Sequence, residues 1–410
     1  MMVKWRRPSI SPRVLFRNDH HRREKIACIL LLLFCVVLWH FESSLTPSSL
    51  SPRGRSVKAL GFQAQQPKHQ NLPEPTCAIL LFGLPRAFPV VWPSLQRHVI
   101  LPNAGYGCDY YVHAFDVPHE PAGRSGQGGP VDTQAALTTL QDYIQNKLPN
   151  DPLSLRHSSR PATIHVSTST DEAFQTAHTD LLHRVETVQD EEGRSIYVPW
   201  KHENYEPSTT TNILKMWHSI QQAWQSMEEQ VQEQKKNSYS RVAVLRWDVV
   251  YMTPVDIYQI NATHRDLENT HVVLPGFAKY PVNDRGIYGP TDAVRVWATE
   301  RFRHVDTYVQ EYRFKRPGSG IHSERYLGQF LLPRMQSQFP SYTMVERTDW
   351  CFYRARADYS VWISDCPLPA HARRDAAVAY VTGCSCTDVQ NRFRDVKEVT
   401  CCVDDAQVVT

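Results

Sequence analysis

Hydrophobic residues are distributed unevenly over the first eighty positions of the chain. An apolar run from Ile26 to Phe41 follows a strongly basic stretch and precedes a segment rich in Ser, Pro and Gln. An apolar helix with its cationic flank on the N-terminal side keeps that flank in the cytosol. We therefore predict a cytosolic tail at 1–25, a transmembrane signal anchor at 26–41 and a flexible stem at 42–75. A cleaved signal peptide is the alternative interpretation of the same run.

Beyond residue 76, apolar runs alternate with segments of helical periodicity. The clearest helix, at 211–234, has apolar residues spaced alternately by four and three positions, which places them on one face. Continuous apolar runs predict strands buried on both sides, as in parallel sheets. The predicted strands are 77–82, 109–115, 162–166, 240–248 and 271–274, and the other predicted helices are 133–147, 171–188, 291–314 and 323–336.

This alternation predicts an α/β domain with a mainly parallel sheet, which we place at 76–345. We expect residues 346–410 to form a Cys-rich segment that packs on it, because six of the ten cysteines follow residue 350. Two others, Cys28 and Cys35, belong to the predicted anchor. An even number beyond the anchor predicts disulfides in an oxidising compartment. Zinc is the weaker alternative, because the C-terminal cysteines lack the two-residue gap of common zinc sites.

The charge of the chain is concentrated in its tail. The formal net charge is +3, and eight basic residues against two acidic ones precede residue 26, which leaves 37 basic against 40 acidic residues beyond it. A near-neutral domain argues against a nucleic-acid partner, which requires a concentrated basic face. The sequon Asn261-Ala-Thr263 predicts a glycosylated surface loop.

Charged residues stand where several of the predicted strands end. Arg246 and Asp248 end the strand that follows the clearest helix, and Arg86 follows the first strand. Asp284 and Arg285 follow a further short strand and a turn. Ligands of open α/β sheets bind beyond the carboxyl ends of the strands. A carboxylate there suits a divalent cation and an arginine suits phosphate, although an Arg–Asp pair that simply ends a strand is the alternative.

These residues lie within a wider resemblance. The stretch from Tyr239 to Pro254 resembles the R-x-D-x-x-(aromatic)-x-x-P strand of certain largely uncharacterised Golgi glycosyltransferases, which are type II membrane enzymes with a GT-A-like domain. Val282-Asn-Asp-Arg-Gly-Ile-Tyr-Gly289 is similar to their NDR turn, and Gly320-Ile-His-Ser-Glu-Arg325 is similar to the segment before their next helix. The resemblance extends over residues ~77 to ~335 in the expected α/β order.

The resemblance implies a GT-A-like fold, a nucleotide-sugar donor and, in many such enzymes, Mn²⁺ on the donor diphosphate. Asp248 would then be the metal or donor ligand. Position 246 is Arg, so the second carboxylate of a DxD motif is missing, and Arg246 offers an alternative, metal-independent partner for diphosphate. Metal dependence therefore stays open. Arg86 is a further candidate donor ligand at the end of the first strand.

The resemblance also implies catalytic residues. Asp284 or Glu324 would act as the base for an acceptor hydroxyl group, and Arg285 and Arg325 would offset charge on the leaving diphosphate. We expect a glycan, protein or lipid acceptor and a single-pass location in the Golgi or ER membrane with the domain in the lumen. A Golgi sulfotransferase and an inactive lumenal binding protein are the alternatives.

Overall fold

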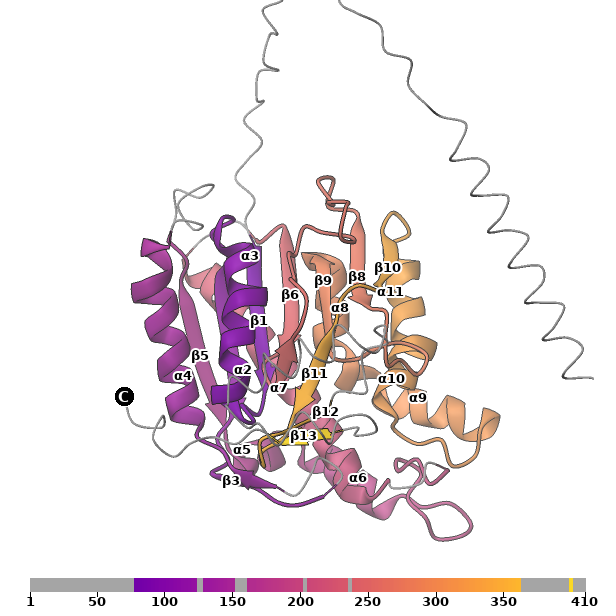
Figure 1. Cartoon of the computed structure of the whole chain (residues 1–410). Helices are drawn as coiled ribbons and strands as arrows, with labels where there is room; N and C mark the ends of the chain where they lie inside the picture. The colour runs from indigo at the N-terminus through magenta and orange to yellow at the C-terminus, as the bar shows by residue number, and fades with distance from the viewer. Residues whose placement is uncertain are drawn as a thin grey trace, which may run out of the picture. The chain divides into compact units, whose positions relative to one another are not determined.

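Among the described residues, seven strands form a central sheet in the order β10-β8-β9-β6-β1-β2-β5 (Figure 1). Neighbouring strands are parallel except at β9, which is antiparallel to both β6 and β8. The predicted α/β architecture with a mainly parallel sheet is therefore confirmed. The strands of this sheet are β1 (Cys77–Gly83), β2 (Asp109–Phe115), β5 (Ile164–Ser169), β6 (Arg241–Arg246), β8 (His271–Pro275), β9 (Gly286–Pro290) and β10 (Thr343–Arg347).

The computed structural model describes residues 77–123, 128–151, 161–201, 205–234, 238–362 and 398–400. The tail, anchor and stem predicted at 1–75 lie outside these ranges, as do the cysteines beyond Cys351. Within the described ranges, none of the helices combines the length and the apolar composition that crossing a membrane requires. Contacts divide the chain into Met1–Lys68 and His69–Thr410, and the described residues belong to the second unit.

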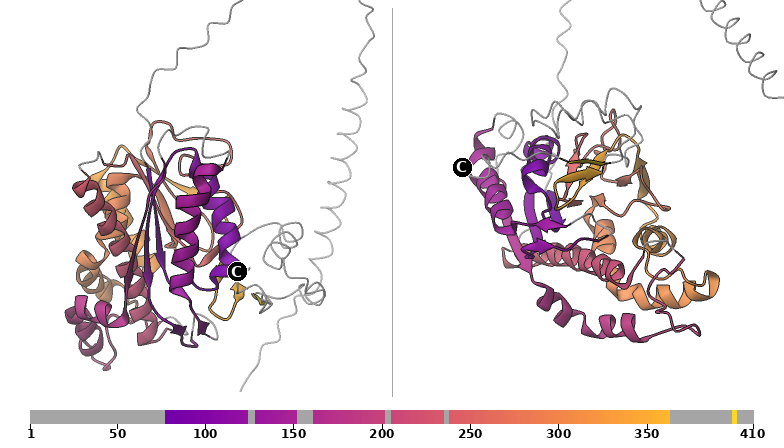
Figure 2. Two further views of the ribbon diagram at one scale, coloured as in Figure 1. Left: turned by 90° about the vertical axis from the view of Figure 1, so that its left-hand side faces the viewer. Right: turned by 60° about the horizontal axis from the view of Figure 1, so that its bottom comes forward.

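Two layers of helices cover the sheet (Figure 2, left). One face packs against α2, α3 and α4, and the other packs against α7, α8 and α11. Successive residues of a strand pack alternately against the two layers. In β1, Ile79 and Leu81 pack against the first layer, and Leu80 and Phe82 pack against the second. The helices are α2 (Phe88–Leu95), α3 (Leu101–Ala104), α4 (Thr133–Asp142), α5 (Asp171–Ala177), α6 (Thr179–Thr187), α7 (Pro207–Glu233), α8 (Thr291–Thr299), α9 (Arg301–Lys315), α10 (Ser323–Tyr326) and α11 (Leu332–Gln338).

The helix predicted at 211–234 is α7, and its apolar stripe carries the packing that the periodicity indicated. Trp217, Ile220, Trp224 and Met227 are all buried. The two single helices predicted at 171–188 and 291–314 are each divided in two, at His178 and at Glu300, where backbone dihedral angles leave the helical region.

A second, smaller sheet lies at the carboxyl end of the central strands (Figure 1). It contains β7 (Val249–Tyr251), β11 (Phe352–Ala355), β12 (Ser360–Trp362) and β13 (Glu398–Thr400), and β3 (His119–Glu120) pairs separately with β4 (Gly129–Pro130). β7 follows β6 almost directly, and β11 pairs with it in antiparallel orientation. The chain beyond residue 345 thus supplies the end of β10 to one sheet and whole strands to the other.

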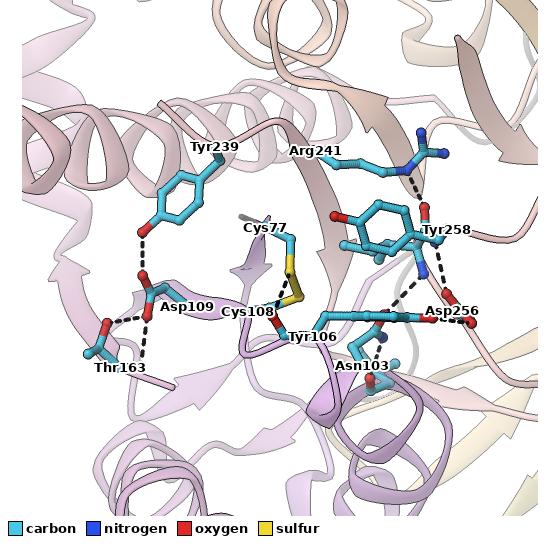
Figure 3. The surroundings of a disulfide bond; sticks show 12 residues. Cys77, Asn103, Tyr106, Cys108, Asp109, Thr163, Tyr239, Arg241, Asp256 and Tyr258 are labelled. Atoms are coloured by element: carbon cyan, nitrogen blue, oxygen red, sulfur yellow. Dashed lines mark hydrogen bonds between the residues drawn. A yellow bond between two sulfur atoms is a disulfide. The ribbon is translucent and has the colours of Figure 1, made fainter. Parts of the chain in front are cut away.

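A disulfide joins Cys77 and Cys108 at the amino end of β1 and β2 (Figure 3). Next to it, Asp109 accepts hydrogen bonds from Tyr239 at 2.6 Å and from the Thr163 hydroxyl at 2.7 Å. Cys351 is also disulfide-bonded. The prediction of disulfides is confirmed for these cysteines.

We expect the double substitution Cys77→Ser with Cys108→Ser to lower the free energy of unfolding by ~3–4 kcal/mol. The two cysteines are 31 residues apart, and removing the cross-link frees a loop of that length in the unfolded chain. Urea unfolding followed by circular dichroism measures the difference. A loss below ~1 kcal/mol would show that strand pairing alone holds this edge.

Candidate anion site at the carboxyl edge of the sheet

The strand order brings Arg86, Arg246 and Asp248 together. β1 and β6 are parallel neighbours, with Phe82 opposite Arg246, so their carboxyl ends meet at one edge of the sheet. Arg246 is the last residue of β6, and Asp248 lies in the two-residue connection to β7. Arg86 follows β1 after a turn that begins at Gly83, where φ is 112°. Such a positive φ favours glycine, so the turn is specified locally.

Asp248 is buried between the two guanidinium groups. Arg246 donates from Nε to Oδ1 at 2.7 Å and from Nη2 to Oδ2 at 2.6 Å, and Arg86 donates from Nη1 to Oδ2 at 2.5 Å. Burial by itself would raise the pKa of the carboxyl group, but Arg246 and Arg86 outweigh it and hold that pKa well below its usual range. Asp248 is therefore ionised throughout the physiological pH range.

Glu120 occupies the rest of the Arg86 guanidinium group. It accepts from Nε at 2.6 Å and from Nη2, so all three nitrogens of Arg86 are engaged by carboxylates. The β3–β4 hairpin that carries Glu120 lies directly against the segment after β11, because a Cβ at Gly129 would be 2.5 Å from the Ala357 carbonyl oxygen. Glycine is required there. Two carboxylates anchor Arg86 through all three of its nitrogens, and one N–H on each Nη is not used in these bonds. The expected role of Arg86 as a donor ligand stays a prediction.

Arg356 adds a cation that forms no ion pair with a carboxylate among the described residues, although the charge of Asp248 acts on it. The Ala355 amide donates to the Asp248 carbonyl oxygen at 3.0 Å, which holds the end of β11 against this edge. Arg356 is buried, and within the described ranges its Nε has no hydrogen-bond partner. Burial and then the charges of Arg354, Arg86 and Arg246 lower its pKa to about 10. An anion would relieve this repulsion.

Asp284 and Arg285 lie beside the same edge. β9 runs antiparallel to β6 with Gly286 opposite Leu245, so the residues before β9 continue alongside Arg246. Burial on its own would lower the pKa of the Arg246 guanidinium, but Asp248 raises it, and the charge of Asp284 adds a smaller raising contribution. Asp284 also acts on Arg301, the first residue of α9. Both residues of the predicted turn are buried.

Glu324 and Arg325 are partly exposed in α10. Arg325 lies close enough to Tyr308 to lower its pKa, against the stronger raising effects of burial and Tyr312. Their expected catalytic roles stay predictions. Asn261 is exposed in its loop, and its side chain accepts hydrogen bonds from the Thr263 amide and hydroxyl groups.

The residues at Asp248 do not fit a Mn²⁺ ion. Both carboxylate oxygens already accept from guanidinium groups, and Arg356, on which the charge of Asp248 also acts, is a further cation at this edge. A divalent cation needs several oxygen ligands with net negative charge. In the described part of the chain, no group of three or more His, Cys, Asp or Glu side chains is placed to bind a metal. The expected role of Asp248 as a metal ligand is therefore not supported.

Next to the anion site, a chain of hydrogen bonds connects three buried or partly buried imidazoles. His113 contacts Ser219 at 2.8 Å and Ser169 at 2.9 Å, Ser169 contacts His218 at 3.2 Å, and His218 contacts His178 at 2.9 Å. One set of neutral tautomers satisfies all of these contacts: His113 and His218 each donate from one ring nitrogen and accept at the other, and His178 donates from Nε2.

This imidazole chain also supports the turn that leads to Arg86. Ser219 accepts the Gly83 amide at 2.8 Å, which fixes the end of β1. Burial and the charge of His218 lower the pKa of His113 to about 3, and burial and the charge of His178 lower the pKa of His218 to about 4. Both rings therefore stay neutral in the fold at physiological pH.

Glu120, Arg301 and Arg356 were not among the residues singled out from the sequence. Glu120 lies in a Gly- and Pro-rich segment, and Arg356 follows a strand that pairs only through tertiary contacts. Arg301 begins a helix inside what the periodicity indicated as one continuous helix. Nothing in their local sequence separates them from surface residues.

The chain matches no protein-family model, and no curated protein sequence matches it. Among solved structures, it resembles mouse xyloside xylosyltransferase 1 in the apo form, with a TM-score of 0.30 and 10% sequence identity. The likeness covers 66% of this chain and 84% of that chain. A likeness this distant defines neither the family nor the function of the present chain.

We expect Asp248→Asn to lower the free energy of unfolding by ~3–5 kcal/mol at pH 7, because it leaves buried guanidinium charge without its counterion. The pKa of Asp248 is depressed in the fold, so its contribution is complete above the unfolded value of ~3.9 and is lost as pH falls below it. The difference between wild type and variant, measured by urea unfolding, should therefore narrow below pH ~4.

Glu346→Gln is the matched control, because Glu346 pairs with Lys279 at the surface. That exposed pair should contribute at most ~1 kcal/mol. Equal losses in the two variants would contradict the buried-charge explanation.

We expect the protein to lose stability as pH falls from ~6.5 toward 4, because unfolded histidines take up protons that His113 and His218 do not. Each contributes a slope of ~1.4 kcal/mol per pH unit in that window. His218→Asn should remove its share of the slope, whereas His183→Asn, at an exposed position of α6, should leave the slope unchanged. Unfolding curves at pH 7.5, 6 and 5 provide the test. A His218→Asn variant whose free energy of unfolding depends on pH as in wild type would contradict the prediction.

Proposed function

We propose that this chain is a glycosyltransferase that takes a sugar from a nucleotide-sugar donor and passes it to a glycan, protein or lipid acceptor. The observation that carries the proposal is uncompensated guanidinium charge at the carboxyl edge of a mainly parallel sheet. Among the described residues, Arg86, Arg246, Arg285 and Arg356 face Glu120, Asp248 and Asp284 there, an excess of one positive charge before Arg354 is counted. The sequence resemblance described above supports the choice of donor.

The donor diphosphate fits the nitrogens that the carboxylates leave open. Arg246 engages Asp248 through Nε and Nη2, so its Nη1 remains, and Arg356 offers Nε. Guanidinium groups bind phosphate through paired N–H donors and keep their charge at any physiological pH. In this proposal they neutralise the diphosphate directly, in place of Mn²⁺.

The same charges would assist the chemical step. Transfer breaks the bond between the anomeric carbon and the β-phosphate oxygen and forms a bond from the acceptor oxygen to that carbon, while the acceptor hydroxyl loses its proton. Negative charge then accumulates on the departing diphosphate, and fixed guanidinium groups stabilise it. Glu324 is the candidate base for the acceptor proton, and Arg285 and Arg325 are candidates for further charge stabilisation.

We place the enzyme in the Golgi or ER membrane, held by residues 26–41 with the α/β domain in the lumen. The basic tail before the apolar run supports this orientation. The Cys77–Cys108 disulfide supports an oxidising compartment.

The proposal is tested by the thermal unfolding of the purified full-length protein with UDP, GDP, CMP or adenosine 3′,5′-bisphosphate, each in EDTA and in Mn²⁺. A nucleotide at ~100 times its dissociation constant should add ~2.7 kcal/mol of stability. We expect UDP or GDP to stabilise the protein equally with and without metal. Arg356→Met should weaken this binding at least ~10-fold, and Arg303→Met, at an exposed position of α9, should not.

Other outcomes separate the alternatives. Stabilisation by the bisphosphate alone would indicate a sulfotransferase, and no response to any nucleotide would indicate a binding protein without this activity. A response that requires Mn²⁺ would contradict the metal-free diphosphate site.

A further inference from the structure

Arg301 is a buried cation whose hydrogen-bonding capacity is largely unused. Its side chain begins α9 and is 1% exposed. Nε donates to the Trp297 carbonyl oxygen at 3.0 Å, but within the described residues Nη1 and Nη2 have no partner. Burial lowers its pKa to about 9 against the raising effects of Asp284 and Tyr326. A buried guanidinium without partners at two nitrogens is costly unless something else binds there.

Aromatic rings fix the orientation of this guanidinium group. It lies over the Trp297 ring at 3.9 Å from the centroid, and the Trp217 ring is 5.9 Å away. The Tyr326 hydroxyl donates to the Arg301 carbonyl oxygen at 2.8 Å, and Trp217 donates to Ser323 at 3.3 Å. Because the rings cannot accept strong hydrogen bonds, the open nitrogens are available only to a polar group that enters beside them.

Asp284 is the complementary group. Its carboxylate acts electrostatically on both Arg246 and Arg301, yet it forms no hydrogen bond or ion pair with either in the described structure. The turn that holds it is fixed by Asn283, which donates to the Phe277 carbonyl oxygen and accepts from the Arg285 amide, both at 2.9 Å. The Trp297 ring under Arg301 contacts Phe82, which lies opposite Arg246, so Arg301 borders the carboxyl edge of the sheet that Asp284 also borders. The charge of Asp284 acts on Arg301 across this edge, and the described residues show no ion pair between them.

We propose that Asp284 and Arg301 form a sugar subsite, in which the carboxylate accepts from one hydroxyl group of the donor sugar and the guanidinium donates to another. A neutral polyhydroxy ring meets both needs, because each hydroxyl both donates and accepts. A second phosphate would suit Arg301 but would be repelled by Asp284. The position also fits, since Asp284 lies beside Arg246, and the sugar of a nucleotide sugar is bonded directly to the β-phosphate.

This inference rests on the proposed function and assigns Asp284 to binding the donor sugar, where the sequence had suggested an acceptor base. It therefore concerns the difference in affinity between a nucleotide sugar and its parent nucleotide. The diphosphate contacts at Arg246 and Arg356 are common to both ligands and cancel in that difference.

The experiment measures dissociation constants by calorimetry with the purified full-length protein. The ligands are UDP, UDP-glucose, UDP-galactose, UDP-N-acetylglucosamine, GDP and GDP-mannose. In wild type, at least one nucleotide sugar should bind ~10-fold tighter than its nucleotide. In Asp284→Asn and in Arg301→Met that ratio should fall to about one, with the affinity for the nucleotide changed less than ~3-fold. Arg303→Met is the matched control and should change neither constant.

Each other result overturns a distinct statement. If the wild-type protein binds none of the nucleotides, both the proposed function and the sugar subsite are contradicted. The subsite alone is contradicted if the wild-type protein binds nucleotides and nucleotide sugars equally. It is also contradicted if the variants keep the wild-type ratio of the two dissociation constants. Equal losses for nucleotide and nucleotide sugar in both variants would place these residues in the diphosphate site. Asp284→Asn preserves the size of the side chain, so it keeps the test valid if Arg301→Met unfolds.

Discussion

The ionised carboxylate of Asp248, buried between Arg246 and Arg86, is the interaction on which this edge of the molecule depends. It connects the ends of β6 and β1, and through Arg86 it reaches Glu120 in the β3–β4 hairpin. A buried charge is costly unless it is fully paired, so these segments must meet in one arrangement. The polar cluster at the carboxyl edge therefore specifies local structure before any ligand binds.

The same pairing determines which cations remain for a ligand. Two carboxylates engage every nitrogen of Arg86 and two nitrogens of Arg246, while Arg356, which directly follows β11, has no ion pair among the described residues. An aspartate that would resemble a metal ligand in sequence is thus already neutralised, and the charge left over is positive. The site suits an anion bound by arginines, with a neutral, hydroxyl-rich group beside it at Asp284.

Features that depend on residues close together in the sequence could be predicted, and features that depend on distant residues could not. The apolar run before Gly83 identifies β1, and the apolar face that contains Trp217 identifies α7. Both could be predicted because the local spacing of apolar residues shows which of them are buried. The charged residues at strand ends, Arg246 and Asp248, could be found because parallel strands end at a common edge. By contrast, the short strands β9 and β11 were not predicted, because they pair with strands that are distant in the sequence.

The sequence by itself determined the α/β class, the approximate positions of its main strands and helices, and several of the charged residues at the carboxyl edge. Only the tertiary structure decided that Glu120 pairs with Arg86, that Arg356 has no ion pair within the described ranges, and that the charge of Asp284 acts on Arg301 without an ion pair between them there. The physical reason is that periodicity reports which residues are buried. The balance of charge at a site depends on partners far apart in the sequence, such as Arg86 with Glu120, 34 positions away, and with Asp248, 162 positions away, and no local pattern encodes which of them meet.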